Sequence, residues 1–112
     1  RKSSDILQTG GEKVSALEVE EALREHPAVG EVAVVGVPDP EWGDRVVACV
    51  VPKVGGAIEP EELRRFAKER LAPFKVPKDV RIFAALPRNA MGKVQKGVLV
   101  AGLGPAENSR SS

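Results

Sequence analysis

The sequence predicts a small α+β domain, in which a three-stranded sheet is flanked by helices and preceded by an N-terminal glycine hairpin. Two observations carry this prediction. Short segments rich in β-branched residues, as strands are, occur at residues 31–37, 45–51 and 79–83. Two other segments repeat apolar residues at the three-to-four spacing of amphipathic helices, at residues 16–26 and 60–71. Such helices bury their apolar stripes by packing on a sheet.

The composition is that of an ordinary soluble domain. The 112 residues are 42% hydrophobic and 29% charged, which allows one modest core without metal or disulfide support. The 17 basic and 16 acidic residues leave a net charge of +1, too little to draw the chain to nucleic acid or a membrane. Neither a membrane-spanning run nor a signal peptide is found. We therefore expect a cytoplasmic protein with neither kind of partner.

The single cysteine and the single histidine suggest no metal or redox centre. Cys49 lies in an apolar run and has no second cysteine to pair with, so we expect a reduced core residue. A reactive thiol is the alternative. His26 falls in the last turn of the first helix, where the helix dipole favours a cation, and we expect it to cap that end. No further histidine or carboxylate cluster accompanies it.

The N-terminal residues predict a hairpin. The chain opens on Arg1 without a methionine, which suggests that it is part of a longer protein. Residues 5–9 and 12–14 flank Gly10 and Gly11 as two short strands flank a tight turn. The two glycines either serve turn geometry alone or let a ligand approach the backbone closely.

The first helix and the two long strands follow. Ser15 and Glu18 match a capping box, which predicts the start of a helix that Pro27 ends. The two strands after it are almost continuously apolar, as strands covered on both faces are. Trp42 lies in the turn between them, where it is either a lid over the core or a flat surface for a ligand ring.

The second helix and its connector come next. Pro60 suits the first turn of a helix, and the mixed charges that follow indicate a solvated face rather than a nucleic-acid patch. Residues 72–78 form a proline-stiffened connector that carries Phe74 and two lysines. The third strand then begins at Asp79.

A lysine beside a glycine marks the segment after the third strand. Pro87 and Asn89 disfavour a helix, and Gly92 gives the backbone freedom just before Lys93. These residues predict a mobile loop that carries an ammonium group. The alternative is an ordinary solvated lysine.

The C-terminal end is predicted to be partly helical and partly disordered. A short helix is expected at residues 95–100. The glycine-, serine- and asparagine-rich residues 101–112 are expected to be a disordered tail, which leaves residues 1–100 as the domain.

Six ordered sequence blocks resemble the C-terminal domain of an acyl-CoA synthetase of the adenylate-forming enzyme superfamily. Their motifs are most similar to those of aryl-CoA and malonyl-CoA ligases. The resemblance extends from Arg1 to about Leu99, and the blocks are residues 5–14, 17–20, 26–29, 34–39, 71–78 and 86–96. It adds a function that composition and periodicity do not provide.

The resemblance implies a two-step reaction. Such enzymes use a carboxylate to attack the α-phosphate of ATP, releasing pyrophosphate, and then transfer the acyl group from AMP to the thiol of CoA. Lys93 matches the lysine that bridges the carboxylate and the α-phosphate during adenylation. The domain then rotates about a hinge, which matches Ser4, and presents the glycine hairpin to the same active site.

The resemblance also implies a CoA site. Gly10 and Gly11 match the hairpin that lines the pantetheine tunnel, and Lys13 occupies its adjacent basic position. Aromatic residues that pack against the CoA nucleotide match Trp42 and Phe74, and a cation facing its phosphates matches Lys78. Three positions depart from the pattern. The aryl-CoA branch has an arginine where this chain has Val76, which puts one phosphate contact in doubt, Ser4 stands where the family usually has Asp or Lys at the hinge, and Glu12 replaces an aromatic residue.

The resulting prediction is the C-terminal domain of an ATP-dependent carboxylic acid–CoA ligase, inactive without its N-terminal domain. ATP and CoA are the expected co-substrates, with Mg²⁺ held in the N-terminal domain. The acid is expected to be of the malonate or aryl type. One alternative is the adenylation domain of a peptide synthetase, which would not need to bind a CoA nucleotide. The other is a small non-enzymatic module that binds an anionic partner.

Overall fold

The computed structural model of the protein describes residues 6–41 and 43–103. Its helices and strands follow the predicted order, with a short 3₁₀ helix in the connector. They are β1 (Ile6–Thr9), β2 (Glu12–Ser15), α1 (Ala16–Arg24), β3 (Val29–Asp39), β4 (Gly43–Pro52), α2 (Pro60–Lys68), η2 (Pro73–Lys75), β5 (Asp79–Ile82) and α3 (Lys96–Leu103).

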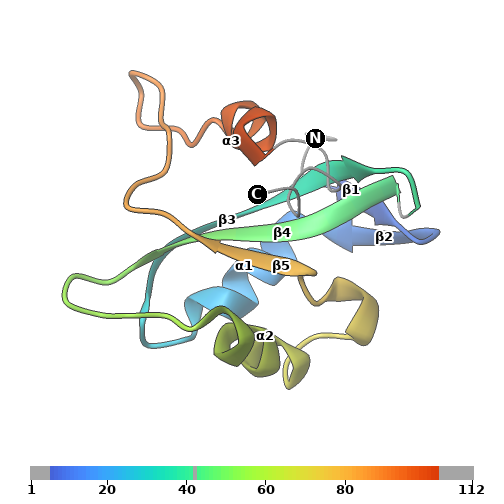
Figure 1. Ribbon diagram of the computed structural model, residues 1–112, viewed down its shortest axis with the longest axis horizontal. Helices are drawn as coiled ribbons and strands as arrows, with labels where there is room; N and C mark the ends of the chain where they lie inside the picture. The colour runs from blue at the N-terminus through green and yellow to red at the C-terminus, as the bar shows by residue number, and fades with distance from the viewer. Residues whose placement is uncertain (1–5, 42, 104–112) are drawn as a thin grey trace.

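The strands form one mixed sheet of five strands (Figure 1). The central strand β4 pairs antiparallel with β3 along its whole length and parallel with β5. Among the described residues, the hairpin of β1 and β2 joins this sheet through one residue pair, Thr9 with Gly43. The predicted α+β class is confirmed, and the predicted hairpin adds two strands to the three predicted ones.

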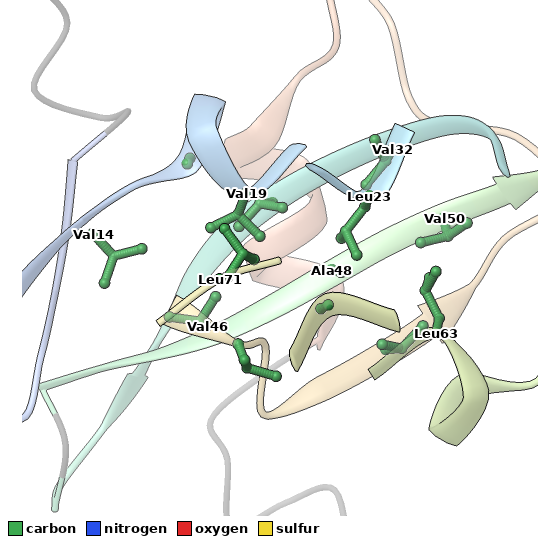
Figure 2. Packing of buried hydrophobic residues seen from close by; sticks show 14 of the residues in the cluster. Val14, Val19, Leu23, Val32, Val46, Ala48, Val50, Leu63 and Leu71 are labelled. Carbon is green, nitrogen blue, oxygen red and sulfur yellow. The ribbon is translucent and has the colours of Figure 1, made fainter. Parts of the chain in front are cut away.

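Helices cover both faces of the sheet, with α1 and α2 on one side and α3 on the other (Figure 1). Because side chains alternate along a strand, Val32 and Val34 of β3 enter the core beneath α1 and α2, whereas Ala33 and Val35 enter the core beneath α3. Figure 2 shows the first of these cores, where Leu23 of α1 packs beside the strands. The prediction of strands covered on both faces is confirmed.

Cys49 lies in the core beneath α3 and is fully buried. Burial raises the pKa of its thiol to about 11, because desolvation penalises the thiolate. The prediction of a core cysteine is confirmed.

The first helix is shorter than predicted. Ser15 caps α1 by accepting a hydrogen bond from the Glu18 N–H at 3.3 Å, but α1 ends at Arg24 and Glu25 forms its C-cap. The prediction that His26 caps this helix is therefore wrong. Its Nδ1 instead accepts the Ala28 N–H at 3.1 Å, which stabilises the turn into β3.

The last helix is longer than predicted. α3 runs to Leu103, so residues 101–103 are helical and the predicted tail begins too early. The apolar Leu103 packs against the core beneath α3, which extends the helix past the glycine at position 102. The remaining tail, residues 104–112, lies outside the described residues. None of the described helices combines the length and the apolar character that crossing a membrane requires.

Candidate functional site

Lys93 lies on a closed turn between β5 and α3, which projects from the rest of the molecule (Figure 1). Arg88 and Val94 pair as an isolated antiparallel bridge across the base of this turn. At its tip the Gly92 N–H donates to the Asn89 carbonyl at 2.9 Å, and Gly92 has a φ of +86°, which favours glycine. The predicted loop is thus a hydrogen-bonded hairpin turn that leaves the Lys93 side chain exposed.

Asn89 forms hydrogen bonds with the backbone of Lys93 within this turn. The Asn89 N–H donates to the Lys93 carbonyl at 3.0 Å, and the Asn89 Oδ1 accepts from the Lys93 N–H at 3.0 Å. The same Oδ1 also accepts from the Met91 N–H at 2.9 Å. From the sequence, Asn89 was interpreted only as a residue that disfavours helix. An asparagine four residues before the lysine was the available signal for these bonds.

Charged side chains tie the base of the turn to β3. Arg88 donates from Nη1 to the Gly92 carbonyl at 2.6 Å, and its Nη2 pairs with the Glu31 carboxylate. At the start of α3, the Lys96 Nζ lies 2.8 Å from the Glu20 Oε2. The same oxygen accepts the Val34 N–H at 2.9 Å. The turn is therefore anchored on both sides of Lys93.

The glycine hairpin lies across the molecule from the Lys93 turn (Figure 1). Gly10 and Gly11 have φ values of +59° and +85°, as a two-residue turn of the primed type requires. A Cβ added to Gly11 would meet no atom within 4 Å, so the turn itself leaves open space beside that residue. Lys13 is exposed on β2 next to this turn.

The connector between α2 and β5 carries Phe74 and Lys78. Phe74 lies in η2 and is 38% exposed. The Lys78 N–H donates to the Val46 carbonyl at 2.8 Å, which fixes this part of the connector on β4. Val76, which replaces the arginine of the aryl-CoA branch, is buried in the core beneath α1 and α2.

Lys78 lines a pocket of about 260 Å³ together with two other cationic residues, Arg64 and Lys68 of α2. Arg64 is held in place because its Nε donates to the Pro77 carbonyl at 2.9 Å. Leu71, Pro73 and Val76 supply the apolar part of the lining. Three cations around one small pocket suit an anionic group with an apolar neighbour. This pocket was not predicted from the sequence, because the mixed charges of α2 indicated only a solvated face.

Two predicted site residues, Ser4 and Trp42, lie outside the described residues. Lys93 and the Gly10–Gly11 turn are at separate ends of the molecule, so the structure does not bring all the predicted site residues together (Figure 1). Within residues 6–41 and 43–103, no group of three or more histidine, cysteine or carboxylate residues could hold a metal ion.

The model of the AMP-binding enzyme C-terminal domain family matches residues 18–93. The chain belongs to this family. Relatives of this AMP-binding enzyme C-terminal domain include a CoA ligase of Gibberella moniliformis, 51% identical over 89% of the chain. The mitochondrial malonate–CoA ligase ACSF3 of Bos taurus is 49% identical over 96% of it. The chain covers 17% and 18%, respectively, of the length of these two relatives.

Solved structures agree with this assignment. ATP-bound MatB from Rhodopseudomonas palustris matches with a TM-score of 0.87 and 39% identity, over 91% of this chain and 20% of that one. The o-succinylbenzoate CoA synthetase MenE of Bacillus subtilis, in complex with its acyl-adenylate intermediate, matches with a TM-score of 0.80 and 38% identity, over 88% of this chain and 20% of that one. The AMP-binding enzyme C-terminal domain described here therefore has the fold of the corresponding part of acyl-CoA synthetases.

Proposed function

We propose that this domain serves both half-reactions of an ATP-dependent, AMP-forming carboxylic acid–CoA ligase. The observation that carries the proposal is the placement of Lys93 and of the Gly10–Gly11 turn at separate ends of one small domain (Figure 1). A single active site can meet two such ends only in succession. The domain therefore rotates between adenylation and thioester formation.

In the first half-reaction Lys93 acts on the phosphate that is attacked. A carboxylate oxygen forms a bond to the α-phosphorus of ATP while the bond to pyrophosphate breaks, which gives acyl-AMP and pyrophosphate. Negative charge is spread over several oxygens as this happens. The Lys93 ammonium, exposed at the end of its turn, stabilises that charge by lying between the carboxylate and the α-phosphate.

In the second half-reaction the glycine hairpin borders the path of the CoA thiol. The thiol sulfur forms a bond to the acyl carbon and AMP leaves, with the thiol proton lost to solvent or base. Gly10 and Gly11 leave room for the narrow pantetheine chain, and Lys13 lies beside it. The open space beside Gly11 supports this role.

The nucleotide part of CoA is assigned to the connector. In this proposal Trp42 and Phe74 pack against the CoA nucleotide, and Lys78 faces its phosphates. Two features support this assignment: the partial exposure of Phe74 and the cationic pocket that Lys78 shares with Arg64 and Lys68. A carrier-bound pantetheine, as used by peptide synthetases, would bring no nucleotide to such a pocket.

The missing parts of the active site are assigned to an N-terminal domain. The curated relatives are more than five times as long as the region they share with this chain, which supports a larger partner domain. That domain would hold ATP, Mg²⁺ and the carboxylic acid, and Ser4 would act as the hinge between the two. On its own this chain would be inactive.

Malonate, or an aryl acid in its place, is the proposed substrate class. Malonate–CoA ligases of Bos taurus and Homo sapiens are 49% and 46% identical to this chain, which favours malonate. A panel of carboxylic acids assayed with the full-length ligase tests this choice. Faster activation of an unrelated acid would contradict it.

The role of Lys93 predicts that Lys93→Ala separates the two half-reactions in the full-length ligase. We expect carboxylate-dependent ATP–pyrophosphate exchange to fall about 100-fold or more, because a positioned charge at the transition state is lost. Thioester formation from supplied acyl-AMP and CoA should stay near the wild-type rate. The exposed Lys53, which follows β4, gives the matched control Lys53→Ala. Equal loss of both half-reactions would contradict the assignment.

A further inference from the structure

Asn89 restrains the backbone of Lys93 with both its main chain and its side chain, and Gln95 Nε2 also donates to the Lys93 carbonyl at 3.3 Å. Asn89 bonds both polar backbone groups of Lys93, one through its own N–H and one through its Oδ1, each at 3.0 Å. The Cα–Cβ direction of Lys93 is therefore set by its contacts with Asn89 more than by packing, since the Lys93 side chain is exposed.

Asn89 also accepts a hydrogen bond from a second N–H in the turn. Oδ1 also accepts the Met91 N–H at 2.9 Å, so one amide oxygen holds the two residues that flank Gly92. Gly92 is the residue with the most conformational freedom in the turn, and its φ of +86° lies where a glycine costs little. Without the two bonds to Oδ1, the N–H groups on both sides of this glycine would lose the acceptor that holds them.

Arg88 supplies a separate restraint at the base of the turn. Its guanidinium reaches the Gly92 carbonyl at 2.6 Å and the Glu31 carboxylate of β3. This contact ties the turn to the sheet as a whole. It does not bond the backbone of Lys93, so it cannot replace Asn89.

From this geometry we propose that Asn89 is a positioning residue for Lys93 in the adenylation step. The inference rests on the proposed function of Lys93. A lysine has four rotatable side-chain bonds, so an error in the direction of its first bond is carried to the ammonium group. Misplacement of a catalytic group by about 1 Å costs on the order of 100-fold in rate. Asn89 limits that error before ATP and the acid arrive.

The test uses two substitutions of Asn89 in the full-length ligase. Asn89→Ala removes the Oδ1 acceptor but keeps the backbone bond, whereas Asn89→Asp keeps an acceptor oxygen at the same place. For Asn89→Ala we expect the kcat of carboxylate-dependent pyrophosphate exchange to fall about 10- to 100-fold. The KM for ATP and the transfer of supplied acyl-AMP to CoA should change less than about twofold. Asn89→Asp should recover most of the exchange rate.

Amide hydrogen exchange gives a readout that is independent of catalysis. The amides of Met91 and Lys93 should exchange faster in Asn89→Ala and at the wild-type rate in Asn89→Asp, because only the former loses their acceptor. Asp39→Ala is the matched control, since Asp39 Oδ1 accepts the Glu41 N–H at 2.8 Å in the turn between β3 and β4. It should leave pyrophosphate exchange unchanged.

The outcomes separate this inference from the function on which it rests. If Asn89→Ala keeps the wild-type rate of pyrophosphate exchange while Lys93→Ala loses it, the positioning role of Asn89 is overturned and the role of Lys93 is not. Equal loss of both half-reactions in Asn89→Ala would overturn it too, because that pattern indicates a folding defect. Normal pyrophosphate exchange in Lys93→Ala would overturn the proposed function itself. Faster amide exchange in Asn89→Ala together with slower adenylation alone supports the inference.

Discussion

The Glu20 carboxylate accepts a hydrogen bond from the backbone at one edge of the sheet. β3 is an edge strand in the strand order of the described sheet, and the outward Val34 N–H of this strand is accepted by Glu20 Oε2. Lys96 neutralises the same oxygen from the start of α3. A buried N–H and a buried charge are thus satisfied together, since only 8% of Glu20 is exposed.

This arrangement predicts that Glu20→Ala destabilises the domain by about 1–3 kcal/mol, the usual cost of an unpaired buried polar group. Urea unfolding of the 112-residue chain measures the change. Glu21→Ala is the control, because Glu21 is the exposed neighbour on the same helix and its loss should cost less than about 0.5 kcal/mol. If the two variants lost equal stability, the contacts of Glu20 would stabilise the domain no more than an exposed carboxylate does.

Residue-level roles were only partly accessible from the sequence. Lys93 was singled out by its loop-forming neighbours, and a resemblance to a family then supplied its predicted chemistry. Asn89, Glu20 and Arg64 were not, because each acts through hydrogen bonds to residues whose positions depend on the folded backbone. A side-chain type at one position does not reveal which backbone group it will reach.

At the scale of elements, local patterns predicted the strands and helix starts well, but tertiary contacts set several of the ends. Ser15 capped α1 as its capping pattern required. The Glu18 carboxylate, expected to complete that cap, instead pairs with Lys75 of the connector at 2.9 Å. The end of α3 similarly depends on Leu103 reaching the core, which spacing within one helix cannot show.

The hairpin gives a prediction at the scale of elements, which compares two glycines with similar backbone angles. Gly11 and Gly55 have φ values of +85° and +78°, and a Cβ on either would meet nothing within 4 Å. Alanine at each position should therefore cost a similar amount of stability, about 1–2 kcal/mol, because both backbones lie in the left-handed region. If the hairpin borders the pantetheine path, Gly11→Ala raises the KM for CoA or slows CoA transfer, and Gly55→Ala does neither.

The comparison is made in the full-length ligase, with acyl-AMP supplied and CoA varied. Adenylation should be unaffected in both variants, because Lys93 lies at the other end of the domain (Figure 1). Equal CoA kinetics in the two variants would contradict the proposal that the hairpin borders the path of CoA.

On the scale of the whole molecule, the described residues contain two cores, one on each face of the sheet. This supports a domain that folds on its own. Cys49 reports on that folding, since it lies within the core beneath α3 and the chain has no other cysteine.

The isolated chain should therefore protect Cys49 from modification. With a thiol pKa of about 11, only about one folded molecule in a thousand carries a thiolate at pH 8. Reaction with a thiol-specific disulfide reagent should be slow in buffer and fast in urea. As pH rises from about 9 towards 11 the unfolded thiol loses its proton before the folded one, so stability should fall. Equal labelling rates in buffer and in urea would show that the isolated chain does not fold.

Within the part of the chain that the structure describes, Thr9–Gly43 is the one backbone pair between the hairpin and β4, which has a mechanical consequence. β3 is coupled to β4 by a full antiparallel ladder, and ion pairs hold the Lys93 turn and the start of α3 to Glu31 of β3 and Glu20 of α1. Beside the Thr9–Gly43 pair, the hairpin is tied to β4 by the Gln8 N–H, which donates to the Asp44 carboxylate at 2.9 Å. If the proposed roles hold, the domain presents a stiffer end to ATP chemistry and a more compliant end to the thiol of CoA.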